Sequence, residues 1–355
     1  MNEASSEQRM LSRSSGRRSN PGCQQWSTPI RWAVTDHAAT IESASKQTLG
    51  RVYGTASERV RADPSGSSAG GSAGSMSAVN RHQGRIYCRS GVQITLGSGL
   101  TLSYWSQGAV GDPTILFLPG PTDSWRSYEP ILGAIPPHLR VVAVSLRGHG
   151  DSSKPASGYS IEHLAADVVP LLDALDIERA VLVGHSGSCL VARRVALEAP
   201  DRVAGLVLEA APTTLRDDPK LCELVNSVVS ELTDPVGPEF ARAFVADTSS
   251  DVLPAELIEA LVEDLVKVPV RVWQEMFTSL LVYDDTAELS LVNTPALLVW
   301  GDADPLVPRS MQDELAYRIP RAELVVYRGA GHTPRWEEPE RFANDVTTFA
   351  SHSSS

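Results

Sequence analysis

Ser186, Asp304 and His332 are residues whose types, taken together, could perform covalent catalysis. A serine hydroxyl is a weak nucleophile, and a neighbouring imidazole activates it by taking its proton. The imidazole can return that proton to a leaving group, while a carboxylate holds the imidazole in one tautomer and stabilises its charged form. The three residue types therefore predict acyl transfer, with Ser186 as nucleophile, His332 as base and Asp304 as the residue that orients the base.

Ser186 is the central residue of the pentapeptide GHSGS at 184–188. The pentapeptide follows the apolar run RAVLV and precedes a helical pattern, so we expect it to form a sharp strand-to-helix turn. Small flanking residues let strand and helix approach, and the helix N-terminus offers backbone N–H groups to a developing oxyanion. Gly187 is expected to be the first donor. The pentapeptide alone leaves open an ordinary glycine- and serine-rich turn.

Asp304 and His332 also follow apolar runs that are typical of buried strands, in the segments WGDADPLVP at 300–308 and GHT at 331–333. The carboxyl ends of parallel strands share one crevice in an open α/β sheet, so a serine, an acid and a histidine at three such ends can converge. Asp302, two positions before Asp304, is the alternative acid.

Strand and helix patterns alternate along residues 83–211 and 293–352, which predicts two halves of one α/β core, with a mostly parallel sheet flanked by helices. The predicted strands are Val92–Leu96, Leu100–Ser106, Thr114–Leu118, Val141–Leu146, Ala180–Val183, Gly205–Leu208, Ala296–Trp300 and Glu323–Tyr327. Core helices are expected from Ser160, over Cys189–Glu198 and over Pro339–Ala350. Residues 212–292 show helical patterns alone, at Leu221–Leu232, Ala255–Val266 and Arg271–Leu281, so we expect a helical cap inserted into the core.

Residues 1–82 are rich in Ser, Gly and Arg and contain too few apolar side chains to form a core, so they predict a disordered leader. A transit peptide is the alternative, against which its acidic residues argue. The leader holds ten of the 31 basic and six of the 43 acidic residues, so the rest of the chain carries a net charge of −16. An acidic body disfavours nucleic acid as a partner, and no apolar run reaches the length of a membrane span.

The four cysteines show no CxxC pair, and the N-terminus has no apolar signal region. These features predict free thiols and a cytoplasmic location. No P-loop, HExxH or GxGxxG motif is found, so we expect no cofactor and no metal. A small-molecule substrate is the expected partner, and the oligomeric state is open.

Several phrases resemble those of the α/β-hydrolase superfamily, especially bacterial members with a helical cap. They are PGPTDSW at 119–125, LRGHGDSS at 146–153, GHSGS, WGDADPLVP and GHTPRWEEPERF at 331–342. The resemblance covers about residues 85–350 and implies the α/β-hydrolase fold with the triad order Ser, acid, His. It also implies Asp304, the second carboxylate of the GDxD phrase, as the acid.

Two positions depart from the family pattern. Ser188 occupies a position where Gly is usual, and in this the elbow resembles that of strigolactone and karrikin receptors and their bacterial stress-signalling relatives. Pro121 occupies the position whose N–H normally gives the second oxyanion hydrogen bond, and proline has no N–H. We therefore expect Thr122 to substitute, by its backbone or its hydroxyl. Trp125 adjoins this loop and is expected to line an acyl pocket.

A serine at the elbow, rather than the aspartate of epoxide- and halide-cleaving relatives, favours hydrolysis of a small, largely apolar carboxylic ester or lactone through an acyl-serine intermediate. Two alternatives remain. One is a ligand sensor with negligible turnover, suggested by Ser188 and Pro121. The other is a cofactor-free perhydrolase of the haloperoxidase type, or a carbon–carbon bond hydrolase, because these share the triad.

Overall fold

The computed structural model describes residues 80–82, 85–87, 91–111, 113–248 and 253–353, and all of them belong to one compact unit of the chain. The predicted disordered leader lies outside the described residues, except for β1 (Asn80–His82). β1 pairs antiparallel with β2 (Arg85–Tyr87) in a small separate sheet.

Eight strands of the described chain form the central sheet, in the order β10-β9-β8-β7-β5-β6-β4-β3. β3 and β4 pair antiparallel, β4 is antiparallel to β6, and all other neighbours are parallel. Their bounds are β3 (Val92–Thr95), β4 (Thr101–Gln107), β5 (Thr114–Leu118), β6 (Arg140–Val144), β7 (Ala180–His185), β8 (Val203–Glu209), β9 (Ala296–Gly301) and β10 (Ala322–Tyr327). The predicted mostly parallel sheet is confirmed.

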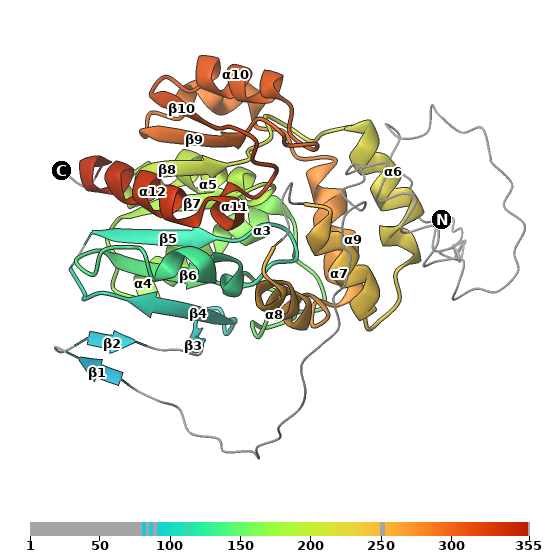
Figure 1. The fold of residues 1–355 in the computed structure, drawn as a ribbon, viewed down its shortest axis with the longest axis horizontal. Coiled ribbons are helices and arrows are strands. Elements are labelled where there is room, and N and C mark those ends of the chain that lie inside the picture. Colours follow the sequence, from blue (N-terminus) through green and yellow to red (C-terminus); the bar gives the residue numbers. More distant parts are fainter. Residues whose placement is uncertain (1–79, 83–84, 88–90, 112, 249–252, 354–355) are drawn as a thin grey trace, which may run out of the picture. The chain divides into compact units, whose positions relative to one another are not determined.

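Helices cover both faces of this sheet, because every residue of β5 to β9 is buried and successive side chains point to opposite faces. One face packs against α3 (Ile161–Ala166), α4 (Val168–Ala174) and α5 (Ser188–Glu198). The other packs against α2 (Glu129–Leu132) and α12 (Pro339–Ser353), and α12 crosses in front of the sheet in Figure 1. Two apolar layers thus hold the strand ends in place.

Four α-helices of the described chain lie between β8 and β9 and gather at one end of the sheet (Figure 1). They are α6 (Pro219–Ser227), α7 (Pro238–Ala246), α8 (Ala255–Leu265) and α9 (Val270–Leu280). Aromatic side chains join α7 to α9, because the rings of Phe244 and Trp273 lie 5.0 Å apart. Within α9, Trp273 also stacks on Phe277. We refer to residues 212–292 as the cap.

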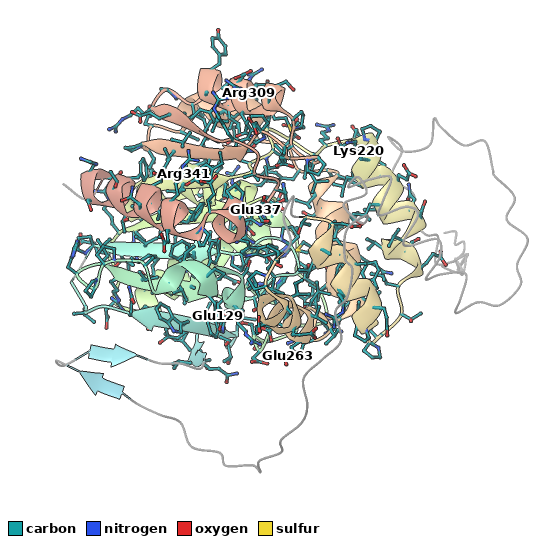
Figure 2. All side chains as sticks on the ribbon, viewed as in Figure 1. Glu129, Lys220, Glu263, Arg309, Glu337 and Arg341 are labelled. Atoms are coloured by element: carbon teal, nitrogen blue, oxygen red, sulfur yellow. The ribbon has the colours of Figure 1, made fainter. Side chains whose placement is uncertain are left out.

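The cap is tied to the core near the loop that follows β5. Arg126, in the short helix η2 (Trp125–Tyr128), pairs with Glu263 of α8 at 3.0 Å and lies 3.7 Å from Glu129 of the core. Glu129 and Glu263, both labelled in Figure 2, therefore share one guanidinium. The hydroxyl of Ser124 also donates to the Asp264 carboxylate of α8. The loop after β5 and the cap helix α8 are therefore joined by polar contacts.

Several helices differ from those predicted. The helix from Ser160 breaks at Asp167, since Pro170 cannot donate to the carbonyl four residues earlier. The segment Leu221–Leu232 divides into α6 and a 3-10 turn. The sequence patterns missed α7, α10 (Arg309–Arg318) and the short helices after β5.

The cysteines differ in part from what was expected. Cys189 is a buried free thiol, whereas Cys222 is disulfide-bonded, so the expectation of free thiols is wrong for Cys222.

Within the described residues, no helix is long and apolar enough to cross a membrane.

Candidate active site

Ser186 lies at a strained turn between β7 and α5. Its backbone has a φ of 52°, a left-handed conformation that is uncommon outside glycine. The Ser186 N–H donates to the Glu209 carbonyl at 2.9 Å, which fixes the turn against β8. A Cβ at Gly184 would lie 2.8 Å from the Ser188 carbonyl oxygen, so the strand and the helix approach too closely for a larger residue. The predicted strand-turn-helix context of Ser186 is therefore present.

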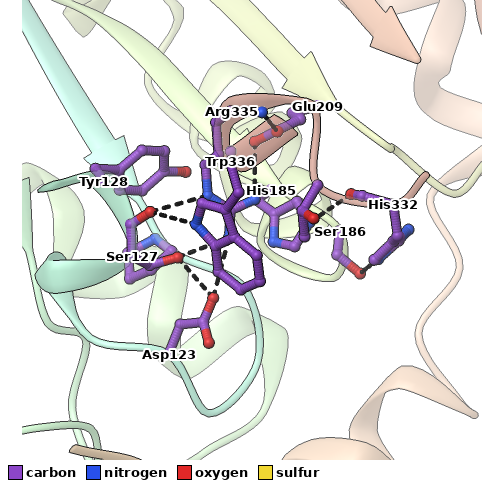
Figure 3. A network of polar contacts seen from close by, with 12 residues as sticks. Asp123, Ser127, Tyr128, His185, Ser186, Glu209, His332, Arg335 and Trp336 are labelled. Atoms are coloured by element: carbon purple, nitrogen blue, oxygen red, sulfur yellow. Dashed lines mark hydrogen bonds and ion pairs between the residues drawn. The ribbon is translucent and has the colours of Figure 1, made fainter. Parts of the chain in front are cut away.

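The three predicted catalytic side chains form one hydrogen-bonded chain. His332 Nε2 lies 2.9 Å from Ser186 Oγ, and His332 Nδ1 lies 2.8 Å from Asp304 Oδ2 (Figure 3 shows Ser186 and His332). A carboxylate only accepts, so Nδ1 carries the proton and Nε2 is free to accept from the Ser186 hydroxyl. This is the tautomer that a general base needs.

The structure brings Asp304, and not Asp302, to the histidine. The Asp304 side chain is fully buried, and its Oδ1 accepts from the N–H groups of Leu306 at 2.8 Å and Val307 at 3.1 Å. Both oxygens of Asp304 are thus used, which fixes its orientation. Asp302 is exposed and accepts from the Gly329 N–H at 2.6 Å instead.

His185 supports the loop that carries His332. Its Nε2 lies 3.0 Å from the His332 carbonyl oxygen, and burial holds the pKa of His185 well below its usual range, so the ring is neutral and Nε2 donates. A Cβ at Gly120 would overlap with His185 Nδ1, so only glycine fits there. His185 is therefore a positioning residue.

The loop after β5 faces the elbow, as the oxyanion prediction requires. A Cβ at Gly187 would lie 2.9 Å from the Pro121 side chain, and the Ser188 hydroxyl donates to the Pro119 carbonyl at 2.6 Å. Ser188 thus uses its hydroxyl to hold the loop, which a glycine could not do. Pro121 lies beside the nucleophile but offers no N–H.

Thr122 is buried with a φ of 73°, and its hydroxyl donates to the Pro121 carbonyl. The N–H groups of Thr122 and Gly187 donate to no acceptor in the described part of the chain. Of the two options predicted for Thr122, the geometry therefore favours its backbone N–H over its hydroxyl.

Trp125 is not placed where the sequence suggested. It is the first residue of η2, and its N–H donates to Ser145 Oγ at 3.1 Å. Its side chain is buried in the apolar layer with Tyr128 and Ile131, and it does not line the cavity at Ser186. The expectation of an acyl-pocket role for Trp125 is corrected, because η2 packs the indole into the core.

A cavity of about 110 Å³ lies at the nucleophile between core and cap. Its wall is mostly apolar, with a few polar groups near the catalytic residues and at the cap. Core residues of the wall are Gly120, Pro121, Asp123, His185, Ser186, Leu306, Val307, His332 and Trp336, and cap residues are Pro212, Leu215, Asp218, Lys220, Leu221, Leu224, Phe244, Val245, Thr248, Phe277 and Leu280.

A buried ion cluster that no sequence pattern indicated supports one wall of this cavity (Figure 3). The fully buried Arg335 lies between two carboxylates, with 3.1 Å to Glu209 Oε2 and 3.1 Å to Asp123 Oδ2. Burial raises the pKa of both Asp123 and Glu209, and Arg335 offsets part of each rise. Asp123 is the member of the cluster that reaches the cavity.

No three His, Cys, Asp or Glu side chains within the described ranges are grouped so that they could hold a metal ion.

A sequence profile of the α/β-hydrolase fold family matches residues 113–339. The chain belongs to this family. A dihydrolipoyllysine-residue acetyltransferase component of an acetoin cleaving system from Pseudomonas putida is 27% identical over 267 residues, which are 68% of this chain and 64% of that protein. The chain thus spans less than two thirds of that relative. A putative carbamate hydrolase RutD from Pseudomonas syringae pv. syringae is 31% identical over 250 residues, 67% of this chain and 94% of that protein.

Solved structures of α/β hydrolases resemble the chain as well. A hydrolase from Pseudomonas aeruginosa has a TM-score of 0.64 and 27% identity, covering 73% of this chain and 97% of its own. Two others match at the level of fold: a meta-cleavage product hydrolase from Pseudomonas fluorescens (TM-score 0.63, 24% identity, 74% and 98% covered) and a bromoperoxidase from Bacillus anthracis (TM-score 0.63, 22% identity, 74% and 100% covered).

Proposed function

We propose that this α/β hydrolase cleaves a small, largely apolar carboxylic ester or lactone through an acyl-enzyme intermediate on Ser186. The observation that carries the proposal is the hydrogen-bonded chain from Ser186 through His332 to Asp304, with distances of 2.9 and 2.8 Å, at the wall of a mostly apolar cavity. The base His332 is within hydrogen-bond reach of both the nucleophile and the orienting acid.

In the proposed reaction, His332 takes the Ser186 proton as the serine oxygen attacks the carbonyl carbon. The N–H groups of Gly187 and Thr122 stabilise the negative oxygen of the tetrahedral intermediate. The intermediate collapses, the bond to the alcohol oxygen breaks, and His332 gives its proton to that oxygen. A water molecule, activated by the same histidine, then hydrolyses the acyl-serine.

The cavity supports a small substrate. Its volume of about 110 Å³ accommodates a short acyl chain, and side chains such as Leu224, Phe244 and Phe277 of the cap offer apolar contacts. Because the cap helices form much of the wall, we propose that the cap controls entry to Ser186.

The proposal includes a small molecule as the partner and no nucleic acid or membrane. A cytoplasmic location stays a prediction from the sequence. It was based in part on free cysteines, and the disulfide at Cys222 disfavours that part.

Labelling with a fluorophosphonate probe and hydrolysis of p-nitrophenyl esters test this function together. We expect wild type to be labelled and active, and Ser186→Ala and His332→Ala to lose both properties. Asp304→Asn should lower kcat by about 10⁴-fold, as loss of the orienting acid does in serine proteases, whereas Asp302→Asn should stay near wild type. Ser310→Ala, at an exposed serine, is the control. Labelling that persists in Ser186→Ala would contradict the proposal.

The ligand-sensor alternative is favoured by one observation, the absence of an N–H at Pro121. It predicts a single slow turnover and a ligand-dependent rise in Tm, whereas fast multiple turnover argues for the hydrolase. Carbamate, carbon–carbon and perhydrolase substrates use the same triad, and the same kinetic assay with those substrates separates them from esters.

A further inference from the structure

Asp123 is a carboxylate in the wall of the cavity that contains Ser186 and His332. It lies in the loop after β5, and its Oδ2 accepts from the Ser127 hydroxyl at 2.8 Å and from Arg335 Nη2 at 3.1 Å. Its other oxygen, Oδ1, accepts no hydrogen bond from any described residue. One oxygen of Asp123 is therefore fixed and the other is left for a molecule in the cavity.

The contacts around Asp123 hold this orientation. Ser127 Oγ also accepts from Arg335 Nη2 at 2.6 Å, and the Ser127 carbonyl accepts from Arg335 Nε at 3.2 Å and from the Trp336 indole at 2.7 Å (Figure 3). Serine, arginine and tryptophan thus form a rigid support on the side of Oδ2. A half-turn of the Asp123 carboxylate about its Cβ–Cγ bond would exchange Oδ1 and Oδ2. One oxygen would still be bound by Ser127 and Arg335, and the other would still be unbound.

Arg335 does not explain why a carboxylate is needed at position 123. Glu209 already pairs with it twice, because Glu209 Oε1 accepts from the Arg335 backbone N–H at 2.9 Å and Oε2 accepts from Nη1 at 3.1 Å. Asp123 adds a second negative charge against the same single cation, with a side chain that is only 11% exposed. Such a charge is costly to bury unless further hydrogen bonds compensate it.

From these contacts we propose that Asp123 is a recognition residue, whose Oδ1 accepts a hydrogen bond from a hydroxyl or amino group of the substrate. This rests on the proposed function and deepens it: the preferred ester carries a hydrogen-bond donor in its acyl or its alcohol part, next to an otherwise apolar body. A donor there supplies the hydrogen bond that the protein leaves unmade at Oδ1. Burial raises the pKa of Asp123, which agrees with a carboxylate that lacks part of its compensation.

Wild-type protein can test this with esters matched in shape. On the acyl side, methyl 3-hydroxybutanoate is compared with methyl 3-methylbutanoate, which replaces the hydroxyl by a methyl group, and with methyl 3-oxobutanoate, which can only accept. On the alcohol side, 2-hydroxyethyl acetate is compared with propyl acetate. We expect kcat/KM in a pH-stat to be about 10- to 100-fold higher for the hydroxyl ester of at least one set, the range for a hydrogen bond to a charged group. Equal rates within both sets would overturn the proposal.

Asp123→Asn gives a second, sharper test. Two donors, Ser127 O–H and Arg335 Nη2, face the position of Oδ2, so the asparagine oxygen takes that position and its NH₂ group faces the cavity. The variant should lose the preference for the hydroxyl ester and gain relative activity on the oxo ester. Retention of the wild-type preference would overturn the proposal. Asp302→Asn, which removes a carboxylate outside the cavity wall, should keep the wild-type order.

Fluorophosphonate labelling of Ser186 distinguishes failure of the recognition role of Asp123 from failure of the proposed hydrolase function. If wild type is labelled and hydrolyses esters without any donor preference, the recognition role fails while the proposed function stands. If wild type is neither labelled nor active on any ester, the proposed function itself fails. A melting curve of Asp123→Asn checks whether the variant is folded. If it is unfolded, the comparison of matched esters with wild-type protein tests the role of Asp123 by itself.

Discussion

Replacement of Arg335 by methionine should destabilise the protein strongly. The guanidinium is fully buried and is the cation that pairs with both Glu209 and Asp123 in the cluster. Methionine keeps most of the apolar stem but leaves two carboxylates without their partner. Breaking a buried ion pair from one side costs about 3–5 kcal/mol of unfolding free energy, because the remaining charge is left uncompensated. We expect a loss in this range at pH 8.

The cost of Arg335→Met should also depend on pH. Burial raises the pKa of Asp123 and Glu209, and removal of Arg335 raises both further, since its charge offsets part of the rise. A carboxyl whose pKa is raised by folding contributes stability below its unfolded value of about 4 and loses it as the pH rises through the folded pKa. The variant should therefore approach wild type as the pH falls from 8 toward 5.

Urea unfolding followed by tryptophan fluorescence measures the free energy of unfolding of wild type and of Arg335→Met at pH 5, 6.5 and 8. Arg318→Met is the matched control, because Arg318 pairs with Glu314 and both side chains are exposed, so its loss should cost at most about 1 kcal/mol. The double variant Arg335→Met/Glu209→Gln should cost less than the two single variants added together, as both charges of one pair are removed. A cost for Arg335→Met equal to that of Arg318→Met, or one unchanged between pH 8 and 5, would refute the reasoning.

Substitutions at two positions of the loop after β5 should separate its structural role from its chemical role. Gly120→Ala places a Cβ against His185 Nδ1 and displaces the ring that supports His332, so kcat for p-nitrophenyl acetate should fall about 10²-fold, the effect of a misplacement near 1 Å. Full activity of this variant would show that His185 does not position the base. Thr122→Val removes the hydroxyl but keeps the N–H, and Thr122→Gly keeps the N–H and suits the positive φ, so kcat of both should stay within about 10-fold of wild type. A loss of about 10²- to 10³-fold in both, the cost of a missing oxyanion donor, would assign the hydrogen bond to the hydroxyl instead.

The sequence predicts the site residues that depend on local patterns. Ser186, Asp304 and His332 each follow an apolar run, and the ends of parallel strands meet at one edge of the sheet, so their convergence follows from topology. The choice of Asp304 over Asp302 came from family resemblance alone. The structure adds a physical reason, because the N–H groups of Leu306 and Val307 hold Asp304 and turn its second oxygen to His332.

The cluster around Arg335 could not be predicted in this way. Its partners Glu209 and Asp123 are 126 and 212 positions away along the chain. A lone arginine in a four-residue helix, or a lone aspartate in a loop, belongs to no periodic pattern. The prediction that Trp125 lines the acyl pocket was wrong for a related reason. Its closeness to the oxyanion loop in sequence does not determine the direction in which η2 points its side chains. Long-range polar contacts and short helices depend on packing that a local pattern does not contain.

The loop after β5 offers no N–H at Pro121, and its contacts hold the neighbouring N–H groups in place. The Ser188 hydroxyl holds the Pro119 carbonyl from the elbow, and the Ser124 hydroxyl binds Asp264 of the cap. An oxyanion hole stabilises the transition state only if its donors need no reorganisation, so a loop held from both sides favours the backbone N–H of Thr122 as a working substitute. Because one of these contacts comes from α8, a displaced cap would also loosen the oxyanion loop, and we expect catalysis to require α8 in contact with Ser124.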